Sequence, residues 1–173
     1  MVRAYFVSTR FSIQIEKADD FSYIWKKGTA LYRGTLNLVN FANDGLLDFK
    51  NSSTLLFSSK LEEHHIFPKA YLRKIDHEYD DSLIDCVANK ALVPKVTNIK
   101  IGEKAPSVYL AELQQSNPKL IDALKSHSIP AELVDGSLDL SFEQFVATRS
   151  SDLLKMLTDL LGPLREAVEH DLS

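Results

Sequence analysis

The chain has 173 residues, 45% of them apolar, so it is long enough to bury a real core in one domain or two small ones. No apolar run approaches the roughly 20 residues that cross a bilayer, and the first residues lack a signal peptide pattern, so we expect a cytoplasmic protein without membrane association. The formal net charge of -4 argues weakly against a large nucleic-acid surface.

The N-terminal third is predicted to be helical. Residues 1–9 read as the end of a helix that begins abruptly, and residues 18–44 continue as amphipathic helical stretches that are broken at Gly28 and Gly34. The segment "NDGLLDFKNSS", residues 43–53, is rich in turn-forming residues and predicts an irregular connection.

The middle of the chain predicts two short strands followed by a helix. "EEHHIF" (62–67) and "DCVANKALV" (85–93) are short and flanked by helix breakers, and we expect them to pair antiparallel. Between them, Pro68 can start a helical turn ahead of a polar loop at 76–82. Pro94 can stand in the first turn of a helix in "KVTNIKIGEK".

The C-terminal part predicts helices throughout. One starts at Pro106, and the next has Asn117 as N-cap with Pro118 at its first helical position. The longest runs from Ser141 to Leu161 with apolar residues near the helical period, and Gly162-Pro163 is expected to end it. The fold class is therefore α+β, mostly α-helical, with a short antiparallel β-hairpin and helix embedded in a helical domain.

For several side chains outside these motifs, the sequence predicts only burial or position in the fold. The lone Cys86 excludes an internal disulfide and is expected to be a small buried residue. Trp25 and Tyr32 are expected in the core, and His127 and His170 near helix ends, where cations are favoured.

The adjacent histidines His64 and His65 are the first candidates for chemistry. Histidine is suited to accept a proton from water near neutral pH and is also a common metal ligand. Adjacent side chains on a strand point to opposite faces, so both reach one site only if the strand ends there. The proline at 68 favours such an end.

Two asparagines downstream extend this pattern. Asn89 and Asn98 stand nine residues apart, and an amide oxygen can ligate a hard cation or pin a loop through its backbone. If Asn89 lies on the second strand and Asn98 on the following helix, the crossing brings Asn98 back to the end of the first strand. His64, His65 and Asn98 would then surround one point.

"HHIFP", "VANKALV" and "TNIKIG", in this order, resemble the HNH nuclease motif of ββα-metal folds. The closest likeness is to the C-terminal HNH domain of the two-part GmrSD-type restriction endonucleases, and a related module occurs in RNA-guided CRISPR nucleases. The likeness covers residues 62–110.

The resemblance implies roles for individual residues. His65 would be the general base and Asn89 a positioning residue for its loop. His64 would hold the metal where many relatives have Asp, and Asn98 would be the second ligand where the motif's name implies His. Mg²⁺ is the expected ion, although an imidazole ligand suits Mn²⁺, Ni²⁺ or Zn²⁺ better.

The locally basic stretch that follows suggests phosphate contacts, because such contacts set affinity and register on DNA. The lysines expected to make them are Lys95, Lys100 and Lys104.

The implied function is hydrolysis of DNA phosphodiester bonds, in a modification-dependent restriction or phage-defence system. DNA is the expected partner, with a nucleotide-handling N-terminal domain in the same or another chain. Residues 1–59 would be a helical segment that ends a truncated upstream region, 60–110 the nuclease core and 111–173 a helical subdomain packed on it.

Two other readings stay open. One is a catalytically inactive HNH-like module that binds DNA or a protein, which the acidic residues after 105 and the short chain favour. The other is the C-terminal piece of a longer protein that is active only with its missing half.

Overall fold

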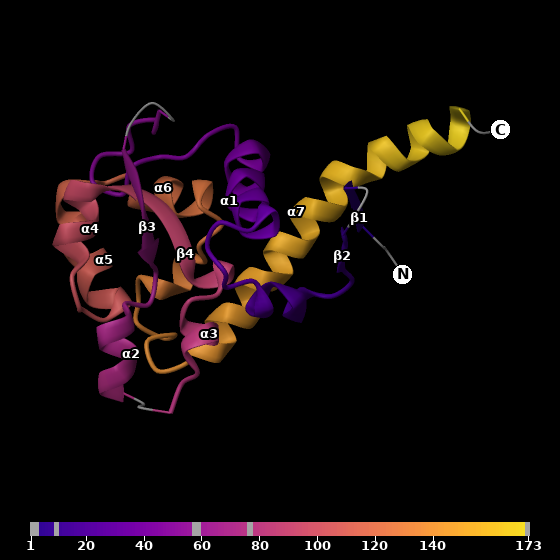
Figure 1. The fold of residues 1–173 in the computed structure, drawn as a ribbon. Coiled ribbons are helices and arrows are strands. Elements are labelled where there is room, and N and C mark those ends of the chain that lie inside the picture. The colour runs from indigo at the N-terminus through magenta and orange to yellow at the C-terminus, as the bar shows by residue number, and fades with distance from the viewer. Residues whose placement is uncertain (1–3, 9–10, 57–59, 76–77, 172–173) are drawn as a thin grey trace.

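The computed structural model describes residues 4–8, 11–56, 60–75 and 78–171 (Figure 1). Within these ranges the chain is mostly helical, with two antiparallel sheets of two strands each, which confirms the predicted α+β class. Figure 1 shows the second sheet inside the body of the molecule, with short helices on one side and the long helix α7 on the other.

The first described elements are two paired strands rather than the predicted helix. β1 (Ala4–Ser8) pairs antiparallel with β2 (Phe11–Ile15). The prediction of a helix over 1–9 is therefore wrong. The sequence of β2, FSIQI, alternates apolar and polar residues with the period of a strand, and its β-branched and aromatic residues favour that conformation.

A short 3₁₀ helix, η1 (Ala18–Tyr23), leads to α1 (Ala30–Ala42), whose N-cap Thr29 accepts a hydrogen bond from the Tyr32 backbone. The predicted break at Gly28 is confirmed. The break at Gly34 is wrong, because Gly34 lies inside α1. A helical glycine costs about 1 kcal/mol relative to alanine, and the apolar residues that α1 buries outweigh this cost.

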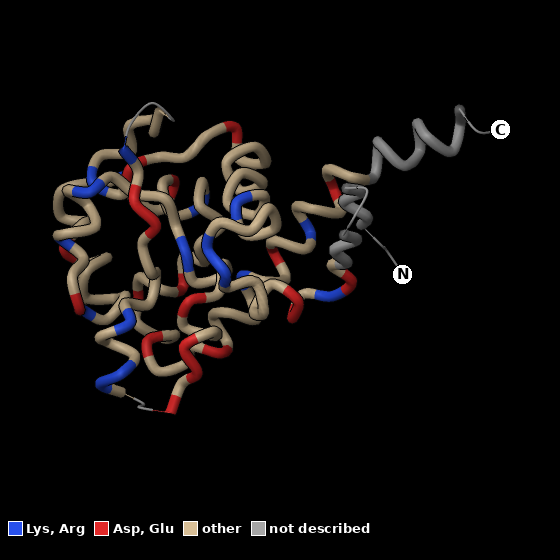
Figure 2. Tube along the Cα trace, in the orientation of Figure 1, with Lys and Arg blue, Asp and Glu red and all other residues tan. Residues whose placement is uncertain are grey.

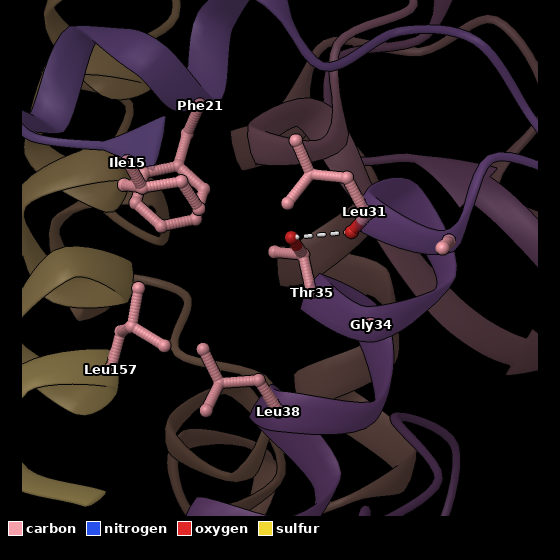
Figure 3. Close-up of a pocket in the computed structure, with 8 residues that line it drawn as sticks. Ile15, Phe21, Leu31, Gly34, Thr35, Leu38 and Leu157 are labelled. Atoms are coloured by element: carbon pink, nitrogen blue, oxygen red, sulfur yellow. Dashed lines mark hydrogen bonds between the residues drawn. The ribbon is translucent and has the colours of Figure 1, made fainter. Parts of the chain in front are cut away.

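Gly34 faces an apolar pocket between β2, η1, α1 and α7 (Figure 3). An added Cβ at Gly34 would meet no atom within 4 Å. The apolar side chains labelled there are Ile15, Phe21, Leu31, Leu38 and Leu157.

The connection after α1 is turn-rich, as predicted, and contains an isolated bridge between Leu47 and Thr54. Within it, the Asp48 carboxylate accepts a buried hydrogen bond of 2.8 Å from Thr97 Oγ1. This hydrogen bond ties the connection to the helix that contains Thr97.

The two central strands and the next helix form a ββα unit. β3 (Leu61–His65) pairs antiparallel with β4 (Lys90–Pro94), as predicted, with His65 opposite Lys90. α4 (Lys95–Ile101) follows directly from Pro94. The second strand is shorter than predicted, because η2 (Val87–Asn89) precedes it and Asn89 is not on the strand.

The link between β3 and β4 holds two short helices. α2 (Lys69–Ile75) follows Pro68, as predicted. α3 (Asp81–Ile84) lies where we predicted only a loop. Asp80 explains the difference, since its side chain accepts a hydrogen bond from the Ser82 backbone and caps this single helical turn.

α5 (Pro106–Ser116) starts at the predicted proline. α6 (Leu120–Ser126) begins later than predicted, because Asn117 is not its N-cap: its side chain accepts from the Lys119 backbone and donates to Phe49 O. A further 3₁₀ turn, η3 (Ala131–Leu133), follows α6.

α7 (Phe142–Asp171) continues through Gly162 and Pro163, which were predicted to end it. Proline removes one backbone hydrogen bond and can kink a long helix without ending it. Among the helices of the described ranges, none is long and apolar enough to cross a membrane.

α7 also supports the central unit. The ring of Phe67, just after β3, lies 5.3 Å from that of Phe142 and 4.9 Å from that of Phe145. Arg149 is fully buried and donates to Ala88 O at 2.7 Å and to His127 O at 3.1 Å. All three expected segments contribute apolar side chains to one buried cluster, so helices distant in sequence hold the ββα unit in place.

Candidate functional site

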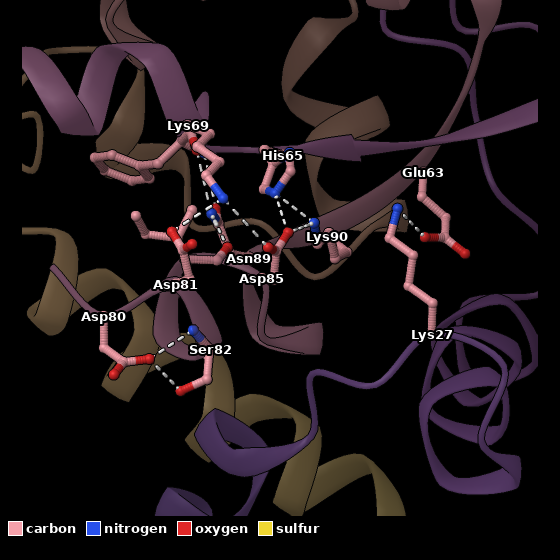
Figure 4. Close-up of polar contacts among 12 residues, drawn as sticks. Lys27, Glu63, His65, Lys69, Asp80, Asp81, Ser82, Asp85, Asn89 and Lys90 are labelled. Carbon is pink, nitrogen blue, oxygen red and sulfur yellow. Dashed lines mark hydrogen bonds and ion pairs between the residues drawn. The ribbon is translucent and has the colours of Figure 1, made fainter.

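His64 and His65 leave β3 on opposite faces, as a strand requires. His64 Nδ1 lies 2.8 Å from Asn98 Oδ1 of α4. His65 instead places its Nε2 2.7 Å from Asp85 Oδ1 and against the Lys90 ammonium (Figure 4). The structure thus brings His64 and Asn98 together, but the expectation that His65 shares their point is wrong, because His65 lies on the other face of β3 and has its own polar partners.

His64 is buried, with 4% of its surface exposed, and its ring meets the Tyr109 ring edge to face at 6.1 Å. Burial lowers the pKa of His64 to about 4, so the ring is neutral at pH 7. Its Nε2 is buried without a hydrogen-bond partner among the described residues. Because Asn98 Oδ1 can only accept, the neutral ring places its proton on Nδ1 and leaves the Nε2 lone pair unused.

Asn98 is also bonded to a residue that the sequence analysis missed. Its Nδ2 donates to Glu62 Oε2 at 2.8 Å. Glu62 precedes His64 by two residues and so shares its face of β3. The strand period could have identified Glu62, because alternate residues share a face.

His65 is partly open to solvent, with 24% of its side chain exposed. Burial and the nearby Lys90 ammonium lower the pKa of His65, and Asp85 offsets part of this effect. Burial alone would raise the pKa of Asp85, but hydrogen bonds from Lys90 and His65 outweigh it and bring the pKa to about 2. His65 is therefore a neutral imidazole beside a carboxylate at neutral pH.

Lys90 is a second partner of His65 that the sequence analysis missed. Its side chain is fully buried and its Nζ lies 2.8 Å from Asp85 Oδ1. Burial lowers the pKa of Lys90, while Asp85 opposes that shift. Only the fold reveals this contact, since Lys90 and His65 come from opposite strands.

Asn89 is fully buried and bonds only to the backbone in the described contacts. Its Oδ1 accepts from Phe67 N at 2.8 Å, and its Nδ2 donates to Phe67 O at 3.1 Å and Ile84 O at 3.0 Å. The backbone of Asn89 also accepts from Ile66 N. These bonds fix the chain immediately after His65.

The three lysines expected to contact phosphate lie on and after α4. Lys95 and Lys100 are exposed, and the half-buried Lys104 pairs with Glu112. Figure 2 shows acidic and basic residues interspersed around β3 and β4 rather than gathered by sign. Lys95 and Lys100 are thus more accessible to a phosphate than Lys104.

Of the predictions for the remaining side chains, some are confirmed and one is wrong. Cys86 and Tyr32 are buried, as predicted, and the Tyr32 hydroxyl donates to Glu63. Trp25 is 42% exposed, so its prediction as a core residue is wrong. His127 lies at the C-terminal end of α6, as predicted, but it is buried, and burial lowers its pKa to about 4, so it is not a cation at pH 7. The side chain of His170 lies outside the described residues.

In the described ranges, no group of three or more His, Cys, Asp or Glu side chains is placed to hold a metal ion. The set on the His64 face differs because it includes the amide of Asn98. It offers a neutral imidazole, an amide oxygen and a carboxylate, which are all accepted ligands of divalent ions. These donor types suit a divalent ion that accepts nitrogen as well as oxygen ligands.

Comparison with known proteins finds a relative, the "Uncharacterized protein MJ0686" of Methanocaldococcus jannaschii. It is 32% identical over 159 residues, and the match covers 78% of this chain and 26% of the relative. The chain thus spans about a quarter of the length of the relative that it matches. No family model matches the chain, and no solved structure matches it significantly.

Proposed function

We propose that the chain is a metal-dependent endonuclease domain of the HNH type, similar to the C-terminal domain of GmrSD-type restriction endonucleases, that hydrolyses DNA phosphodiester bonds. The observation that carries the proposal is the contact of His64 with Asn98 across the ββα unit, next to His65 at the end of β3. His64 and Asn98 come from β3 and α4 of the ββα unit, while His65 leaves β3 on the opposite face.

His64 and Asn98 would hold the ion, through an imidazole nitrogen and an amide oxygen. When bound, a divalent ion supplies positive charge that offsets the charge developing on the phosphate and the leaving oxygen. Mg²⁺ or Mn²⁺ would serve. The low pKa of His64 suits this role, because a ligand imidazole must be unprotonated.

His65 would accept the proton of the attacking water. When its Nε2–H donates to the Asp85 carboxylate, Nδ1 keeps a free lone pair for that proton. Lys90 favours the neutral ring that a base needs, and Asp85 would stabilise the imidazolium that forms. Asn89 would hold the turn that follows His65.

DNA would lie beside the partly exposed His65 at the end of β3. Lys95 and Lys100 would contact flanking phosphates. Lys104 would contact a phosphate while it also pairs with Glu112. In a larger assembly, a nucleotide-handling domain would control DNA cutting. The assembly would belong to a restriction or phage-defence system that acts on modified DNA.

A nicking assay tests the proposal. The purified chain with Mg²⁺ or Mn²⁺ should convert supercoiled plasmid to open circles, and His65→Ala should lower the rate about 100- to 10,000-fold. Added imidazole should restore part of the rate, which a merely structural role for His65 would not allow.

Equal cutting by His65→Ala would show that His65 is not the base. Absence of cutting and of metal binding in the parent chain would favour the inactive, DNA- or protein-binding module instead.

A further inference from the structure

Three side chains on one face of the ββα unit converge on a single amide. Asn98 presents its Oδ1 to His64 Nδ1 and its Nδ2 to Glu62 Oε2, each at 2.8 Å. Glu62 and His64 reach it from alternate positions of β3, and Asn98 comes from α4. The Glu62 carboxylate therefore lies beside the same amide group that presents its oxygen to His64.

From this arrangement we infer that Glu62 is a third metal ligand beside His64 and Asn98, and that the completed site binds Mn²⁺ in preference to Mg²⁺. The inference rests on the proposed function and adds to it a ligand and a metal preference.

The spacing of the donors fits a six-coordinate ion. Metal–ligand bonds of about 2.1 Å at right angles place neighbouring ligands about 3 Å apart. The distance of 2.8 Å between His64 Nδ1 and Asn98 Oδ1 is close to that edge. The pair is thus spaced as adjacent ligands once the Nδ1 proton moves to Nε2, because the nitrogen that binds an ion must be unprotonated.

His64 Nε2 lies across the ring from Asn98 and is buried without a hydrogen-bond partner in the described part of the chain. It can therefore carry the ring proton when Nδ1 binds an ion, and no hydrogen bond to the protein is lost. The neutral ring can thus present an unprotonated Nδ1 beside Asn98 Oδ1.

The donor set decides the preference among ions. Two oxygens and one imidazole nitrogen form a mixed set, whereas Mg²⁺ strongly prefers oxygen ligands and retains its water. Mn²⁺ accepts oxygen and also binds nitrogen sites. The Glu62 carboxylate adds the negative charge that neither His64 nor Asn98 supplies.

The test is direct titration of Mn²⁺ and Mg²⁺ into the purified chain by calorimetry, with electron paramagnetic resonance of free Mn²⁺ as a second readout. Glu62→Gln should weaken Mn²⁺ binding by more than about 100-fold, beyond the 10- to 100-fold loss that is typical of residues that only hydrogen-bond to a metal ligand. Glu63→Gln is the matched control, because it removes the same charge one residue away on the opposite face. There Glu63 pairs with Lys27 and Tyr32, and Mn²⁺ affinity should stay within about twofold, below the loss typical of metal-site residues.

Glu62→Asp, which keeps the carboxylate, should retain more Mn²⁺ affinity than Glu62→Gln, and thermal unfolding would verify that each variant is folded. If the parent chain binds Mn²⁺, with loss in Asn98→Ala but equal affinity in Glu62→Gln, the inference on Glu62 is overturned while the proposed nuclease site stands. Equal or tighter Mg²⁺ binding overturns the metal preference. If the parent binds neither ion, the metal site of the proposed function fails as well.

Discussion

Buried His127 should make the stability of the protein depend on pH in a predictable way. Its Nε2–H donates to Leu47 O at 2.9 Å, and its ring packs edge to face on Phe49 at 4.7 Å. Burial lowers the pKa of His127 from 6.5 to about 4, with the Leu47 hydrogen bond opposing the shift and Arg149 adding to it.

The sign follows from proton binding. Between pH 6.5 and 4 the unfolded chain binds the proton of His127 and the folded chain does not, so acid favours unfolding. The contribution to stability is fully present above pH 6.5 and falls as the pH drops toward 4. With one pKa unit worth 1.36 kcal/mol, His127 should remove about 3 kcal/mol from the free energy of unfolding by pH 4.

Urea unfolding of the parent and of His127→Gln at pH 7 and pH 4 would measure this effect. Glutamine can still donate to Leu47 O but does not titrate, so the variant should lose about 3 kcal/mol less between the two pH values. The lowered pKa of His64 acts equally in both proteins and cancels in the comparison. Equal losses in parent and variant would refute the burial of a neutral His127.

Two further predictions concern stability and use the same urea assay. Asn89→Ala should lower the free energy of unfolding by about 3 kcal/mol or more, because it leaves buried backbone groups unpaired. Asn51→Ala, on the surface, is the control and should lower it by less. Similar losses in the two variants would contradict a structural role for the Asn89 amide. Gly34→Ala should stabilise by about 1 kcal/mol, because it adds a helix-favouring residue in open space. Gly102→Ala should destabilise the protein instead, because Gly102 has a positive φ of 58°. If Gly34→Ala lowered the free energy of unfolding, the pocket beside Gly34 would be closed to a methyl group.

The elements that the sequence predicted correctly depend on neighbours along the chain. The two central strands, the helix next to Pro94 and the one that starts at Pro106 follow from local period and from the restricted backbone of proline, although β3 ends at His65 rather than at the predicted Phe67. The spacing of His64 and Asn98 also placed two polar side chains together, because the crossing from strand to helix is short.

Only the tertiary structure decided what surrounds His65 and how far several elements extend. Asp85 and Lys90 reach His65 from other parts of the chain, and no local pattern distinguishes a buried, paired lysine from an exposed one. Gly34 and Pro163 break helices by local rules, but both lie within helices in the fold. Local rules give preferences of about 1 to 3 kcal/mol per residue, and packing over a whole helix can exceed them.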